Sequence, residues 1–185
     1  MSNLTRRHFV ITGASVPLLA ACGNGVNSRG AQRIDERVDA ATEFMYREVP
    51  GTEELAFNAA GMLVMPLITE AGFGFGGSYG RGALRINNAT VDYYSAIAGT
   101  FGLQIGAQQY AHALFFMTEE ALRDFRESPG WAVGGDVRYA LNDRGGSLGI
   151  DTTVLTDPVI AVVFGQAGLI IGATLDGTRY SRILP

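Results

Sequence analysis

Glycine and aromatic residues alternate between positions 71 and 84, in the run AGFGFGGSYGRGAL. Alternation of this kind favours a strand with one face of nearly bare backbone, against which another sheet or helix can pack. The wider segment 61–110 contains ten glycines and seven aromatic residues, but only four charged residues. This part of the chain therefore predicts β-strands that are largely buried.

Helical periodicity occurs in three places. Apolar residues recur at every third or fourth position from Gln32 to Val49, which predicts an amphipathic helix that ends at Pro50-Gly51. A shorter helix is expected from Thr52 to about Ala60, and another from the capping residue Thr118 to about Glu127. Helices are therefore expected at the start of the domain and in one short insertion.

The remaining segments predict strands. Val159 to Phe164 and Leu169 to Leu175 are apolar runs joined by Gly165–Gly168, which indicates a core hairpin. Together they are too short and too rich in glycine for a membrane-spanning helix, which needs about 20 apolar residues. Further strands are expected at 62–65, 71–84, 90–96, 98–117, 131–141 and 180–184, with turns at 87–88 and 142–146. The first of these is expected to stop at Pro66, the stretch 98–117 to be broken at its glycines, and the strand at 131–141 to be interrupted by the pair Gly134-Gly135. The predicted fold class is α+β: a compact β-rich domain of mainly antiparallel strands, with N-terminal helices and one short inserted helix.

The N-terminus resembles a bacterial export signal. Arg6 and Arg7 precede an apolar run that ends at Ala21, a pattern typical of secretory signals, and the paired arginines resemble the twin-arginine motif. Leu19-Ala20-Ala21-Cys22 resembles a lipobox, in which the cysteine thiol is lipidated. The alternative is a buried N-terminal helix with a core cysteine.

These motifs divide the chain into three parts. We expect a signal peptide at residues 1–21, a tether at 22–30 and one domain at 31–185, with Cys22 as the lipidation site. A fully acylated cysteine holds a protein on a membrane, whereas a single acyl chain binds only marginally. Gly23 stands where an aspartate would be the usual signal for retention in the inner membrane, which favours the outer membrane.

Composition limits the functional classes. The chain has 185 residues with 17% charged residues, enough for one domain with a core. All 14 basic residues are arginine, against 18 acidic residues, and the net charge of −4 argues against nucleic-acid binding. Removal of residues 1–21 takes away two arginines and no acid, which lowers the charge to −6. A single cysteine cannot form an intrachain disulfide, and one cysteine with two histidines provides few ligands for a zinc site. No metal or cofactor is therefore expected.

Two patterns could carry chemistry. Gly72–Gly77 fits GxGxxG, which binds dinucleotides only between a strand and a helix N-terminus, but more β-like sequence follows it. His112 could serve a Ser/His/Asp hydrolase together with Ser95 or Ser147, although no G-x-S-x-G nucleophile motif is present. A structural histidine fits the alternating segment around His112 better. The protein is therefore predicted not to be an enzyme.

One group of residues suits lipid. Phe73, Phe75 and Tyr79 are followed closely by Arg81 and Arg85, and an apolar wedge beside cations fits acyl chains and phosphate groups. The alternative is a core strand whose aromatic rings face inward. These five are the candidate lipid-binding residues. A second basic row consists of Arg29, Arg33 and Arg37. It could contact anionic headgroups beside the anchor, but it is interleaved with acids, and a solvated helix face fits it better.

Residues from about 55 to 184 resemble the SYLF domain, a lipid-binding family also found in yeast actin-patch proteins. The segments that carry the resemblance are Ala60–Pro66, Ala71–Gly82, Phe101–Gln108, Leu114–Thr118, Ser128–Trp131 and Pro158–Gly165. The resemblance implies a compact β-rich α+β domain that binds lipid. Eukaryotic relatives bind phosphoinositides through basic residues near an amphipathic N-terminal helix, some bind actin, and bacterial members often carry a lipoprotein signal.

The expected function is that of a non-enzymatic lipid-binding lipoprotein. Cys22 would anchor it on the periplasmic side of the bacterial cell envelope, with membrane phospholipid as its partner. One alternative is a structural or protein-interaction module of the envelope, in which the glycine-rich strands form a recognition edge. A further alternative is a hydrolase that uses His112.

Overall fold

The computed structural model describes residues 28–133, 137–139, 142–143, 147–148, 157–165, 168–169 and 175–185. Within the strands, the description leaves out the side chains of residues 73–75, 100–107, 137–139, 142–143, 147–148 and 168–169. The predicted signal peptide and Cys22 also lie outside the described residues. No helix in the described ranges is both long and apolar enough to cross a membrane.

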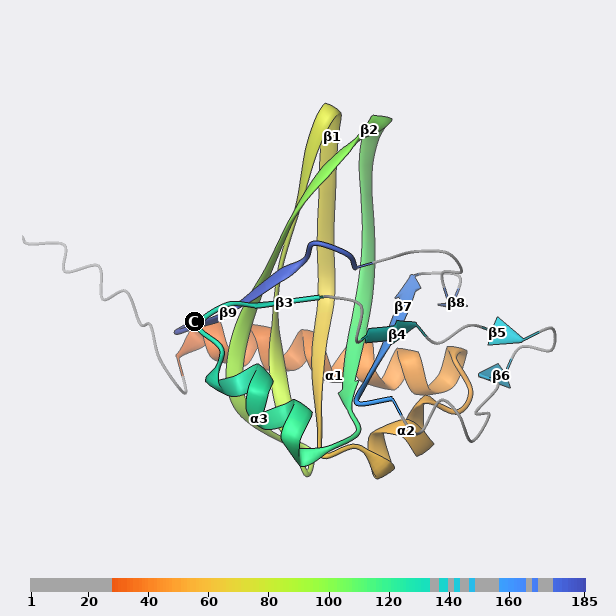
Figure 1. Cartoon of the computed structure of the whole chain (residues 1–185), viewed down its shortest axis with the longest axis vertical. Helices are drawn as coiled ribbons and strands as arrows, with labels where there is room; N and C mark the ends of the chain where they lie inside the picture. Colours follow the sequence, from red (N-terminus) through yellow and green to blue (C-terminus); the bar gives the residue numbers. More distant parts are fainter. Residues whose placement is uncertain are drawn as a thin grey trace, which may run out of the picture.

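Two long strands form a hairpin that dominates the fold. β1 (Gly61–Ile86) pairs with β2 (Ala89–Phe116) in antiparallel register along its whole length. Asn87 and Asn88 make the turn, with φ angles of 49° and 62°, which asparagine tolerates better than most residues. The predicted turn at 87–88 is confirmed, and the hairpin extends well beyond the other strands (Figure 1).

Further strands complete the sheet around this hairpin. β9 (Arg179–Ile183) pairs with β2 at residues 93–97, and β7 (Val159–Gly165) pairs with β2 at residues 111–116. The outer members are β3 (Trp131–Ala132) beside β9, with β4 (Val137–Tyr139) and β8 (Gly168–Leu169) beside β7. β5 (Asn142–Asp143) and β6 (Ser147–Leu148) form a separate pair. Among the described strands, all pairs are antiparallel except β4 with β7, which confirms the predicted fold class.

Two glycines of β1 allow the strand to pass close to its own first half. A Cβ on Gly82 would overlap the carbonyl oxygen of Val64, and one on Gly80 would meet the carbonyl oxygen of Leu67. A side chain at either position would therefore collide with backbone that has no room to shift. This close approach explains why positions 80 and 82 are glycine.

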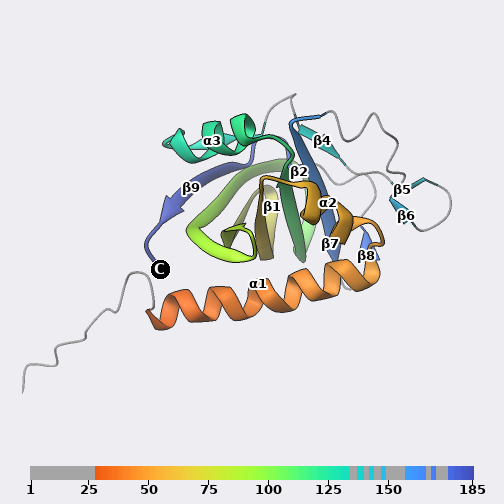
Figure 2. The ribbon, with the colours of Figure 1, turned by 90° about the horizontal axis from the view of Figure 1, so that it is seen from below.

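In the described part of the chain, three helices flank the sheet. α1 (Arg29–Glu48) and α2 (Thr52–Asn58) precede it, and α3 (Glu119–Glu127) follows the hairpin. Figure 2 shows α1 along one side of the curved sheet and α3 on the opposite side. Ser28 caps α1 by accepting a hydrogen bond from the N–H of Ala31 and donates one to the carbonyl oxygen of Pro185, which ties the two ends of the domain together.

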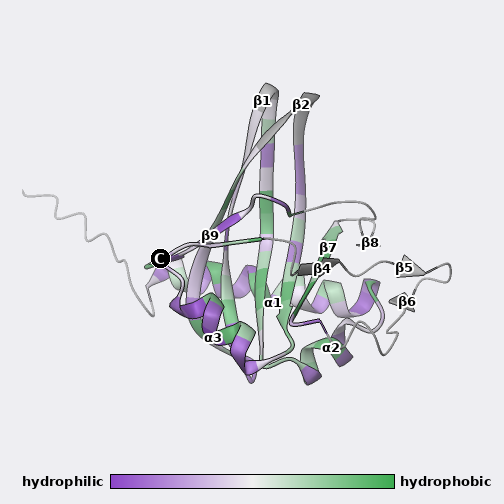
Figure 3. Cartoon of the chain, viewed as in Figure 1, coloured by the Kyte–Doolittle hydropathy of each residue, from purple (hydrophilic) through white to green (hydrophobic). Residues whose placement is uncertain are grey.

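The strands bury side chains on both faces. One face packs under α1 and includes Val64, Phe115 and Val162. The other face encloses a second core closed by α3, with Leu114 and Phe125 among its members. Figure 3 shows hydrophobic residues along β7 and the lower part of β1, and hydrophilic residues on α1 and α3. Burial on both faces explains why these strands are continuous apolar runs.

Two boundary predictions are wrong. β1 does not stop at Pro66 but passes through it, because a register shift between Met65 and Ile68 accommodates a residue that has no N–H. β2 is one continuous strand through its glycines, although its register with β1 shifts between Gly102 and Gly106. The interrupted strand predicted at 131–141 contains two short strands, β3 and β4, which pair with different neighbours.

Candidate functional site

An exposed apolar pair lies on the extended hairpin. Tyr79 of β1 and Ile97 of β2 are register partners, so their side chains share one face of the sheet. They are 52% and 55% exposed, among the most exposed large hydrophobic residues in the described part of the chain. An exposed tyrosine beside an exposed isoleucine presents an apolar surface with one polar hydroxyl, a combination that suits a membrane interface.

Two arginines flank this pair on the same face. Arg81 is exposed and lies two residues from Tyr79 along β1, and Arg179 of β9 is the register partner of Ile97. None of the ion pairs found among the described residues involves Arg81. We call Tyr79, Arg81, Ile97 and Arg179 the outer patch. It combines apolar area with cations, which fits a phospholipid surface.

The outer patch adjoins a stretch of hairpin that has no other strand beside it. β9 pairs with β2 only as far as Ile97, and β7 pairs with it only from Ala111 onward, so between these points β1 is the only partner of β2 among the described strands. This stretch and the part of β1 that pairs with it carry a single charged residue, Glu70. The middle stretch of the hairpin is therefore nearly uncharged.

The remaining sequence-based lipid candidates fall in different places. Phe73 and Phe75 lie in the extended part of β1, with Phe75 in register with Phe101, and their side chains are outside the description. Arg85 is not in the outer patch. It lies under α1, where its guanidinium group is 2.6 Å from a carboxylate oxygen of Asp39. Its charge is used to hold α1 on the sheet.

Two more hydrogen bonds hold α1 against the hairpin. The carboxylate of Asp35 accepts one from the hydroxyl of Thr90 at 2.8 Å and one from the hydroxyl of Tyr93 at 2.7 Å. Burial and the adjacent carboxylate raise the pKa of Tyr93 to about 12. Asp35 and Asp39 lie four residues apart on one helix face. Their contacts hold α1 against the part of the hairpin next to its turn.

His112 is completely buried in the second core. Its Nε2 lies 2.6 Å from the hydroxyl of Tyr180, and burial lowers the pKa of the imidazole to about 3. Ser95, the described serine considered as its nucleophile, donates instead to the carbonyl oxygen of Ser181 at 3.4 Å. Ser147, the second one considered, has a side chain outside the description. The neutral, solvent-inaccessible ring fits a structural histidine.

The GxGxxG segment lies wholly inside β1. Gly72 and Gly74 pair with Gly106 and Gly102 of β2, and the strand continues to Ile86 without a helix. The amide groups are therefore not gathered at a helix N-terminus, where a pyrophosphate would bind. Among the described residues, no group of three or more His, Cys, Asp or Glu side chains could hold a metal ion.

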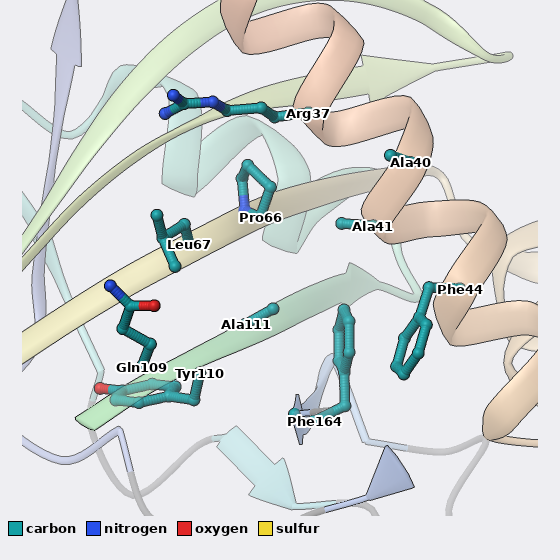
Figure 4. Close-up of a pocket in the computed structure, with 11 residues that line it drawn as sticks. Arg37, Ala40, Ala41, Phe44, Pro66, Leu67, Gln109, Tyr110, Ala111 and Phe164 are labelled. Atoms are coloured by element: carbon teal, nitrogen blue, oxygen red, sulfur yellow. The ribbon is translucent and has the colours of Figure 1, made fainter. Parts of the chain in front are cut away.

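A groove of about 450 Å³ runs between α1 and the sheet. Figure 4 shows that α1 forms one wall, with Arg37, Ala41 and Phe44, and that residues of β1, β2 and β7 form the other. The rings of Phe44 and Phe164 stack with their centroids 6.3 Å apart and their planes 21° from parallel. The guanidinium carbon of Arg47 lies 5.4 Å from the centroid of the Phe44 ring.

Sequence reasoning did not find Ile97, Arg179 or the groove. Ile97 and Arg179 become neighbours of Tyr79 only through strand register. Arg37 was part of the basic row interpreted as a solvated helix face, and it is indeed exposed, but it also borders the groove. The available signal for the groove was the spacing of Arg37, Ala41 and Phe44, which places all three on one side of a helix.

Comparison with known proteins finds a family match for part of the chain. Residues 97–182 match a family model described as Ysc84, the Las17-binding protein actin regulator. The matched segment runs from Ile97 in the outer patch through the second half of β2 and α3 to β9. No curated protein matches the chain.

Proposed function

We propose, on the premise that residues 97–182 belong to the Ysc84 (SYLF) domain family, that this protein is a non-enzymatic phospholipid-contacting lipoprotein of the bacterial cell envelope. Membership of this family supports the interpretation of the domain as a lipid-binding or protein-interaction module. In this proposal Cys22 carries the lipid anchor on the periplasmic side, most simply at the outer membrane. The outer patch then makes a second contact with the bilayer. Membrane phospholipid is its principal partner.

The single observation that carries the proposal is the pairing of Tyr79 with Ile97. Both side chains are more than half exposed on a hairpin that extends beyond the rest of the sheet. Burying apolar surface contributes about 25 cal/mol for each Å² removed from water, so two such side chains give a membrane contact a measurable free energy. Arg81 lies close enough to approach a lipid phosphate from the same face.

Vesicle flotation of the chain from Ser28 to Pro185 tests this contact without the anchor. The vesicles are either phosphatidylcholine alone or phosphatidylcholine with phosphatidylglycerol. The unaltered chain is expected to float with both, and a double variant with Tyr79→Ser and Ile97→Ser is expected to remain at the bottom. Leu184→Ser is the matched control, because Leu184 is an exposed hydrophobic residue outside the patch.

Two outcomes would overturn the proposal. One is absence of flotation with both kinds of vesicle, since Cys22 would then be the sole membrane contact. The other is unchanged flotation of the double variant. Unfolding temperatures of all variants, measured in parallel, separate a loss of binding from a loss of fold.

A protein-interaction role is the second candidate. The family description names a binding protein, and Phe57 on α2 is 89% exposed, which gives a protein partner an aromatic anchor point. Crosslinking in intact cells distinguishes the two functions. One specific protein captured at Phe57, together with negative flotation, would favour the interaction module over the lipid contact.

A further inference from the structure

The groove between α1 and the sheet is amphipathic. Figure 4 shows the guanidinium group of Arg37 and the amide of Gln109 toward one end, and the rings of Phe44 and Phe164 toward the other. Its volume of about 450 Å³ falls within the range of about 300–1,000 Å³ that is usual for small-molecule sites. A ligand that matches both ends has one charged group and one apolar body.

We propose that this groove binds one long-chain carboxylate, a free fatty acid, with its carboxylate at Arg37 and its chain between α1 and the sheet. This site is separate from the outer patch and does not depend on the bilayer contact proposed above. It gives the protein a soluble ligand in addition to a membrane surface.

The apolar end of the groove suits an acyl chain. Ala41 and Phe44 contribute one wall from α1, and Ala111 and Phe164 contribute the other from β2 and β7. These side chains carry no hydrogen-bonding group, so a polar ligand would lose its hydration there without compensation. A hydrocarbon chain loses nothing of that kind and gains from leaving water.

The cationic end suits a carboxylate. None of the ion pairs found in the described part of the chain involves Arg37, so its guanidinium group is available to a ligand. A guanidinium group binds a carboxylate through two parallel hydrogen bonds, and the amide N–H groups of Gln109 can donate to the same group. Arg47, the other cation nearby, is paired with Glu48 at 2.8 Å and lies over the ring of Phe44. A single available cation indicates a single negative charge.

Ligand titration tests the site. The full chain with Cys22→Ser is titrated with a fluorescent anthroyloxy fatty acid below its micelle concentration, and bound probe is displaced with palmitate or with hexadecanol. We expect saturable binding, with palmitate displacing the probe at about a tenfold lower concentration than the uncharged alcohol. Arg37→Gln is expected to abolish that preference, and Arg123→Gln on α3 is the matched control.

A second variant tests the apolar end. Ala40 borders the groove but is exposed, so Ala40→Phe partly fills the groove without disturbing the core. It is expected to weaken binding of palmitate and hexadecanol alike by about tenfold or more, whereas Gln32→Leu, elsewhere on the exposed surface of α1, leaves binding unchanged.

Three results would overturn the proposal: no saturable binding, equal affinity of the unaltered groove for palmitate and hexadecanol, or binding that Ala40→Phe does not change. Flotation of Arg37→Gln and Ala40→Phe on vesicles separates this site from the outer patch. Normal flotation with lost palmitate binding is expected. If the groove does not bind fatty acid, the membrane proposal is still tested separately, by vesicle flotation of the double variant with Tyr79→Ser and Ile97→Ser.

Discussion

The hydroxyl group of Tyr180 on β9 lies 2.6 Å from Nε2 of His112 on β2, inside the second core. β9 pairs with the first half of β2, whereas His112 stands in the second half. The contact therefore links two residues of the curved sheet that are not register partners, since Tyr180 pairs with Ala96 in the backbone ladder. Removing the Tyr180 hydroxyl would leave the buried Nε2 of His112 without this partner, which costs about 1–3 kcal/mol.

Burial of His112 predicts a pH dependence of stability. Its pKa is lowered from 6.5 to about 3 in the folded protein, so below pH 6.5 the unfolded chain binds a proton that the folded chain does not. The stabilisation is complete above pH 6.5 and declines as the pH falls toward 3, by about 1.4 kcal/mol for each pH unit. The His112 imidazole resonance should not titrate between pH 7.5 and 5. A midpoint near 6.5 in the folded protein would contradict this account.

The close approach of the two halves of β1 predicts a sharp difference between glycines. Gly82→Ala should lower the free energy of unfolding by about 3 kcal/mol or more, because its Cβ would overlap the carbonyl oxygen of Val64. A Cβ on Gly99 meets no atom within 4 Å, so Gly99→Ala should change stability by less than about 0.5 kcal/mol. Chemical denaturation measures the free energy of unfolding of both variants. Equal effects would show that the two halves of β1 do not approach each other closely at Gly82.

Arg81 should control the response to lipid charge. One arginine near an anionic bilayer contributes about 1 kcal/mol, so Arg81→Gln is expected to reduce partitioning onto vesicles with phosphatidylglycerol about fivefold. Partitioning onto phosphatidylcholine should remain within error, since the apolar pair is unchanged. The difference should shrink with added salt. If phosphatidylglycerol increases the partitioning of Arg81→Gln as much as that of the unaltered protein, Arg81 does not contact the membrane.

The anchor makes a separate prediction. Cys22→Ser should prevent lipidation and move most of the protein from the membrane fraction to the soluble fraction of cells. Mass spectrometry should find the added acyl mass on the unaltered protein alone. If Cys22→Ser remains with the membranes as completely as the unaltered protein, the cysteine is not its anchor.

The sequence predicts elements here far better than it predicts which of them meet. Periodicity and caps located the helices within a few residues, and Asn87-Asn88 located the hairpin turn. Counting outward from that turn would pair Tyr79 with Ala96. The observed partner is Ile97, because a register shift between Leu84 and Arg85 leaves Val91 unpaired. One extra residue thus decides which side chain completes the outer patch, and periodicity contains no signal for it.

Arg85 shows the same limit from another direction. Its place four residues after Arg81 made it a candidate lipid ligand, whereas the structure pairs it with Asp39 on α1. Only the packing of α1 across the hairpin distinguishes these arginines. Local sequence describes both as cations in an aromatic strand.

Fluorescence from a tryptophan at the outer patch tests the central claim most directly. Tyr79→Trp, in the chain from Ser28 to Pro185, is mixed with vesicles whose acyl chains carry bromine. Trp131→Phe in the same chain removes the other source of tryptophan emission. We predict that the emission shifts to shorter wavelength and is quenched on vesicles, because the side chain at position 79 enters the membrane interface. Emission that stays at its value in water while the protein floats with the vesicles would show that another surface makes the contact.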